Sequence, residues 1–113
     1  MNNNKFYILV AEWCPHCKMA KDAIFKLTEN YFENGNVEIL EESTEEYKKI
    51  AIKLQKFSIP AFVIVDENNK EVAEWSGPRE YYHLLDFYLK HTETEVIPED
   101  AGLFAKPEQE NVQ

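Results

Sequence analysis

Apolar residues are arranged in two ways along this chain, in short continuous runs and at helical spacing, and each change of arrangement marks a new element. The run Lys5–Val10 is almost entirely apolar and rich in β-formers, which predicts a strand buried on both faces. After Pro15, apolar positions recur at steps of three and four, which predicts a helix with one buried face. That face comprises Cys17, Ala20, Ile24, Leu27 and Tyr31. The turn sequence at residues 34–36 ends this unit.

A second strand and a second helix follow. Residues 37–40 predict a short strand, and Ser43 with Glu46 forms a capping-box pattern. In that pattern the Ser43 side chain caps the helix and Glu46 reaches back to the capping residue. The buried face of this helix is predicted to hold Tyr47, Ile50, Ala51 and Leu54.

The remaining elements are a hairpin and a last helix. The break at residues 58–60 precedes a third strand at Ala61–Val65, and a polar turn links it to an antiparallel partner at Glu71–Trp75. The segment at residues 76–78 ends the hairpin and starts the last helix. Tyr81, Leu84, Leu85 and Tyr88 are its predicted buried stripe. The order is β-α-β-α-β-β-α, which is an α/β fold.

This order predicts one domain over residues 1–91, followed by an acidic tail over residues 92–113. The tail has six acidic residues against the single Lys106. Its composition favours a flexible, solubilising segment. The alternative is that Leu103 and Phe104 dock the tail back onto the domain.

Charge and length narrow the classes of function. The chain has 113 residues and a formal net charge of −9, so it is expected to bind neither nucleic acid nor anionic membranes. The first apolar run is too short for a signal peptide, and no stretch is long enough to span a bilayer. We expect a soluble, cytoplasmic monomer.

The two cysteines, Cys14 and Cys17, are the candidate chemistry. A structural disulfide framework needs more cysteines, and a closed zinc site needs about four ligands. His16 is the only histidine near the pair, because His83 and His91 lie far away in the sequence. A redox-active pair is the remaining interpretation, with no metal site expected.

The position of the pair at a helix start gives each sulfur a different task. Residues three apart on a helix are neighbours, so the two sulfurs can bond with little movement. Unpaired N–H groups at the helix start stabilise a thiolate at Cys14, and His16 can add positive charge. Pro15 suits the first turn because it lacks an N–H. Cys17 lies on the buried stripe and is expected to be shielded.

Three short motifs resemble the thioredoxin family. Residues 11–19 (AEWCPHCKM) are similar to its active-site segment, residues 58–61 (SIPA) to its cis-proline loop, and residues 76–77 to its glycine beside the active site. The resemblance implies a four-stranded mixed sheet with helices on both faces. It makes Cys14 the nucleophile, Cys17 the resolving cysteine and Pro60 the cis-proline. Trp13, Ile59 and Gly77 would rim the substrate groove.

Several positions depart from the family. The dipeptide Pro15-His16 is similar to that of the DsbA-type thiol oxidases, and it favours the reduced thiolate form. The family's buried aspartate falls at Ile8, so no proton acceptor for Cys17 is evident. No counterpart of the family's first strand and helix is expected before Lys5, so the resemblance implies a core of the size of a glutaredoxin. Glu12 would repel a carboxylate of glutathione.

The predicted function is thiol–disulfide exchange with protein disulfides, in electron transport and cell redox homeostasis. The electron donor would be a flavoenzyme of the thioredoxin-reductase type or glutathione, and no cofactor is needed beyond the Cys14–Cys17 disulfide. Two alternatives remain open. One is a glutathione-dependent glutaredoxin. The other is a binding or adaptor module whose cysteines are redox-silent or hold a metal.

Overall fold

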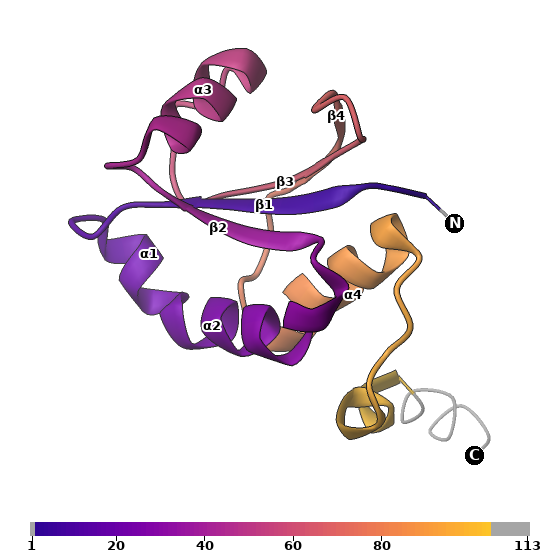
Figure 1. The fold of residues 1–113 in the computed structure, drawn as a ribbon. Helices are drawn as coiled ribbons and strands as arrows, with labels where there is room; N and C mark the ends of the chain where they lie inside the picture. Colours follow the sequence, from indigo (N-terminus) through magenta and orange to yellow (C-terminus); the bar gives the residue numbers. More distant parts are fainter. Residues whose placement is uncertain (1, 105–113) are drawn as a thin grey trace.

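The structure, a computed structural model, describes residues 2–104. A four-stranded sheet in the order β2-β1-β3-β4 forms its centre (Figure 1). The strands are β1 (Lys5–Val10), β2 (Val37–Glu41), β3 (Ala61–Val65) and β4 (Glu71–Trp75). Strand β1 is parallel to β2 and antiparallel to β3, and β3 is antiparallel to β4. The predicted mixed sheet and the order of elements are confirmed.

Helices cover both faces of the sheet, because the central strands are apolar on both sides. Helix α3 (Glu45–Leu54) lies on one face, and α1 (Pro15–Met19), α2 (Lys21–Asn30) and α4 (Tyr81–Thr92) lie on the other (Figure 1). Side chains alternate across a strand. Phe6 and Ile8 of β1 therefore pack under α2 and α4, whereas Tyr7 and Leu9 pack under α3. Full burial of each such side chain stabilises the fold by about 1.5–3 kcal/mol.

The helix predicted after Pro15 is divided in two. Helix α1 ends at Met19, and Ala20 has a backbone conformation (φ −92°, ψ 1°) outside the helical range. The amide of Ala20 still donates to the carbonyl of His16, and Ile24 donates to Ala20. The helical stripe of buried residues therefore continues through the break, which is why the sequence pattern shows one helix.

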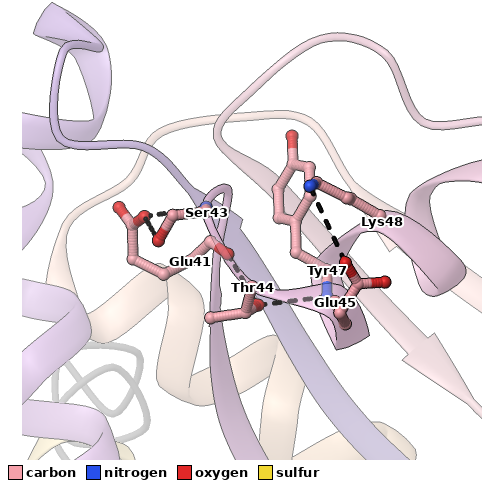
Figure 2. Close-up of polar contacts among 6 residues, drawn as sticks. All are labelled: Glu41, Ser43, Thr44, Glu45, Tyr47 and Lys48. Carbon is pink, nitrogen blue, oxygen red and sulfur yellow. Dashed lines mark hydrogen bonds and ion pairs between the residues drawn. The ribbon is translucent and has the colours of Figure 1, made fainter.

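The predicted cap of α3 is one residue too early. Thr44, not Ser43, is the N-cap, and its Oγ1 accepts a hydrogen bond from the amide of Tyr47 at 3.2 Å (Figure 2). The hydroxyl and amide of Ser43 instead donate to the carboxylate of Glu41, each at 3.1 Å. The amide and hydroxyl of Thr44 both donate to the carbonyl of Glu41, at 2.9 and 2.7 Å, and this turn places Thr44 at the helix start.

The segment after α4 is packed against the domain as far as residue 104. The carboxylate of Asp100 is buried and accepts hydrogen bonds from the hydroxyls of Tyr31 (2.8 Å) and Tyr81 (2.7 Å). Phe104 lies against the ring of Tyr82. Residues 92–104 therefore pack against the domain through Asp100 and Phe104, as the docking alternative expects for Phe104, whereas Leu103 is exposed. This packing lies beyond residue 91, where the domain was predicted to end. Residues 105–113 of the predicted tail lie outside the described residues.

Candidate active site

Cys14 sits at the junction between β1 and α1, where its sulfur caps the helix. It is the N-cap residue, and Pro15 is the first residue of α1, as predicted. The Cys14 Sγ accepts a hydrogen bond from the amide of Cys17 at 3.2 Å. This amide is one of those that a helix start leaves without a partner in the helix. A hydrogen-bond donor aimed at the sulfur stabilises a negative charge on it.

The two cysteines are free thiols in one small apolar cluster. They pack with Ala11 and against the side chains of Val10 and Ile59. Cys17 is 5% exposed, which confirms that it is shielded, but Cys14 is only 3% exposed. The exposed fractions of the two cysteines are therefore too similar to tell which sulfur attacks first. Their hydrogen bonds distinguish them.

Cys17 is held as a neutral thiol. Burial, and then its hydrogen bond with Cys14, raise the pKa of Cys17 to about 11. The backbone of Ala11 and the positive charge of Arg79 act in the opposite direction but are outweighed. Arg79 was not singled out in the sequence. Its position just before the last helix, close to the predicted glycine at residue 77, is the signal that could have found it.

The loop before β3 faces Cys14, as the resemblance implies. The Ile59–Pro60 peptide bond is cis, which confirms that expectation. The Cys14 thiol donates to the carbonyl oxygen of Ile59 at 3.7 Å. Pro60 is buried and Ile59 is half-buried. Sequence positions 14 and 59 are thus brought into contact across the end of the sheet.

The other predicted rim residues lie on two sides of the pair. Gly77 and His16 line one cavity of about 320 Å³, together with Met19 and Arg79. Trp13 is 63% exposed, and its indole Nε1 donates to the carboxylate of Glu42 at 2.9 Å. Glu42 is a contact that the sequence analysis missed. It follows β2, and parallel neighbouring strands end at the same edge of a sheet, so its place near Trp13 could have been inferred.

Among the described residues, no group of three or more His, Cys, Asp and Glu side chains is placed to hold a metal ion. Within residues 2–104 no helix is both long enough and apolar enough to cross a membrane.

Comparison with known proteins agrees with this geometry. The family model described as Thioredoxin matches residues 2–90. This chain belongs to the thioredoxin family. Members of the family act on disulfides in proteins, so a thiol–disulfide oxidoreductase type of function is supported in general terms. No curated protein sequence gives a significant match.

Solved structures of other thioredoxins share the fold at low sequence identity. A mutant thioredoxin from Halobacterium salinarum superposes with a TM-score of 0.60 at 21% identity, covering 86% of this chain and 80% of that one. Thioredoxin from Fasciola hepatica gives 0.59 at 21% identity, covering 80% and 82%. Thioredoxin f2 from Chlamydomonas reinhardtii gives 0.58 at 19% identity, covering 84% of each chain.

Proposed function

We propose that this protein exchanges protein disulfides by a dithiol mechanism, with Cys14 as the nucleophile and Cys17 as the resolving cysteine. One observation carries the proposal. The amide of Cys17 donates to the sulfur of Cys14, while the thiol of Cys17 itself is buried and kept neutral. The sulfur of Cys14 is therefore placed to attack first, and the thiol of Cys17 stays protonated until a mixed disulfide has formed.

The reaction follows in two exchanges. The Cys14 thiolate attacks one sulfur of a substrate disulfide, and the substrate S–S bond breaks with its electron pair on the leaving sulfur. Cys17, after losing its proton, then attacks Cys14 Sγ in the mixed disulfide. A disulfide forms between Cys14 and Cys17, and the second substrate sulfur leaves as a thiolate that takes a proton from water. The substrate disulfide is reduced, and the dithiol is oxidised.

The substrate would bind beside the pair, over Ile59 and Gly77 and against Trp13. Trp13 presents an exposed aromatic surface, and the carbonyl of Ile59 already contacts Cys14. An extended segment that carries a disulfide would lie along this loop, next to the Cys14 sulfur. We further propose that a flavoenzyme of the thioredoxin-reductase type, or glutathione, returns the pair to the dithiol in a reducing cytoplasm.

The test is insulin reduction with dithiothreitol as the electron source. The wild-type protein is expected to accelerate the precipitation of reduced insulin, and Cys14→Ser to abolish the acceleration. Cys17→Ser is the matched variant. When it is reduced, separated from dithiothreitol and then mixed with insulin, it is expected to accumulate a covalent mixed disulfide, which is visible on a non-reducing gel and disappears when dithiothreitol is added back. Full activity of Cys14→Ser would overturn the assignment of the nucleophile.

The same preparation distinguishes the electron donors. NADPH consumption is measured with a thioredoxin reductase in one assay, and with glutathione and its reductase in another. The exposed Glu12, two residues before Cys14, disfavours the carboxylates of glutathione. We therefore expect faster turnover in the first assay. Faster turnover with glutathione would favour the glutaredoxin alternative.

A further inference from the structure

A cavity of about 460 Å³ reaches Cys17, and Gly77 is not among the residues that line it. Its floor is apolar and includes Val10, Ile24 and Ile39. Its polar side chains are two carboxylates and two amines, which belong to Glu12, Lys18, Lys21 and Glu41. The cavity is large enough for water, and its charged side chains can form hydrogen bonds with it. Water can therefore connect the Cys17 thiol with a titratable side chain.

The strand register directs Glu41 into this cavity. Residues 37, 39 and 41 lie on the same face of β2 because side chains alternate along a strand. Val37 and Ile39 pack in the cluster under α2 and α4, which is the face that carries α1. Glu41 continues this stripe at the carboxyl end of β2, beside Val10 of β1. Glu38, by contrast, is exposed on the opposite face.

The proposed function leaves one proton without an acceptor. Cys17 must become a thiolate before it attacks Cys14, yet its pKa is raised to about 11. The family's buried aspartate position is occupied by Ile8, which is completely buried in the apolar core. The acceptor of the Cys17 proton is therefore to be found among the other groups that share a cavity with Cys17.

We propose that Glu41 accepts the proton of Cys17, through water in this cavity, in the step that resolves the mixed disulfide. The inference rests on the proposed function. The proton leaves Cys17 Sγ for water, and water delivers a proton to the Glu41 carboxylate. The Cys17 electron pair forms the bond to Cys14 Sγ, and the substrate sulfur leaves with the electron pair of the bond that breaks. The carboxylate then returns its proton to solvent.

The charges around Glu41 suit this role. The amide and hydroxyl of Ser43 each donate to its carboxylate, which fixes the side chain (Figure 2). Lys18 and Lys21 line the same cavity and contribute its positive charges. Glu12 shares the cavity but is exposed. Two groups from other elements also interact with Glu41 or Cys17. Burial raises the pKa of Tyr47 and the charges of Glu41 and Cys17 contribute to this rise, whereas the charge of Arg79 lowers the pKa of Cys17.

The experiment separates the two exchanges by stopped flow. Reduced protein is mixed with a symmetrical nitrobenzoate disulfide, which releases one coloured thiolate when Cys14 attacks and a second when Cys17 resolves. Glu41→Gln removes the base and keeps an oxygen that can accept from Ser43. Glu41→Asp keeps the carboxylate. Glu38→Gln makes the same charge change on the opposite face of β2, and Glu12→Gln removes the other carboxylate of the cavity.

The wild-type second phase is expected to change little between about pH 6 and 8, because a carboxylate already serves as base there. In Glu41→Gln the second phase slows by about tenfold or more at neutral pH and rises about tenfold per pH unit, as hydroxide replaces the carboxylate. Glu41→Asp retains the flat profile, and Glu38→Gln behaves as wild type. Glu12→Gln is compared in the second phase alone, where it keeps the wild-type rate and pH profile, because loss of its charge beside Cys14 is expected to speed the first attack on a probe that carries carboxylates. The assignment would be overturned if the second phase of Glu41→Gln kept the wild-type rate, or if the second phase were lost in Glu12→Gln and not in Glu41→Gln. Absence of the first phase in the wild-type protein would contradict the proposed function itself, and with it this role.

Discussion

Trp75 lies so close to Gly77 that a methyl group on Gly77 would meet its indole ring at 2.7 Å. The ring has little freedom to move away. Its Nε1 donates to the carbonyl of Pro78 at 2.9 Å, and the ring packs against His83 and Phe87. Gly77 is therefore required by the close approach of an aromatic side chain at the edge of the active site.

Gly77→Ala is accordingly expected to destabilise the fold by about 1–3 kcal/mol, the usual range for forcing extra volume into a packed site. The measurement is the free energy of unfolding from urea titration. Gly102→Ala is the control, because its Cβ would meet nothing within 4 Å. Equal free energies of unfolding for the two variants would show that the Trp75 ring can move aside at no cost in stability.

The cap of α3 gives a second paired comparison. Thr44→Ala removes the Oγ1 that accepts from Tyr47 and is expected to lower the free energy of unfolding by about 1 kcal/mol. Ser43→Ala removes only an exposed contact with Glu41, so its effect should stay within about 0.5 kcal/mol. The reverse ranking in urea titration would restore Ser43 as the capping residue.

The buried Asp100 predicts how stability depends on alkaline pH. Burial, and then the hydrogen bond to Asp100, raise the pKa of Tyr31 to about 12, although a bond from the Ile97 amide acts the other way. The folded protein thus holds this proton more tightly than the unfolded chain, in which the pKa of tyrosine is about 10. The resulting stability is complete below about pH 10 and is lost as pH rises towards about 12.

Asp100→Asn is expected to lower the pKa of Tyr31 and to reduce this alkaline loss of stability. The measurements are tyrosinate absorbance, with Tyr31→Phe to identify the signal, and urea titration at several pH values. Glu99→Gln is the control, since Glu99 is the exposed neighbour of Asp100. An unchanged tyrosinate titration in Asp100→Asn would contradict the role of the carboxylate.

Local patterns were enough to predict most of the fold and the position of the two cysteines at a helix start. The apolar runs of β1 and β3 and the helical stripe after Pro15 depend on neighbours close in the sequence, and their elements are confirmed. The motif at residues 14–17 and the cis bond at Ile59–Pro60 came from spacing and family resemblance. Their proposed chemical roles stay predictions.

The errors and omissions concern long-range contacts. The break at Ala20 leaves no trace in the apolar pattern, because the buried stripe runs through it. The docking of Asp100 depends on two tyrosine hydroxyls, one of them 69 positions away. Composition alone made that segment look like a solvated tail. Glu41 likewise acquires a possible role only when β2 is placed beside β1.

Selective alkylation of the reduced protein tests the central claim most directly. Iodoacetamide reacts with thiolates, so brief treatment near neutral pH followed by peptide mass mapping shows which sulfur is reactive. We predict label on Cys14, with Cys17 left unmodified until the pH approaches its pKa of about 11. Equal labelling of the two cysteines, or preferential labelling of Cys17, at neutral pH would contradict the account.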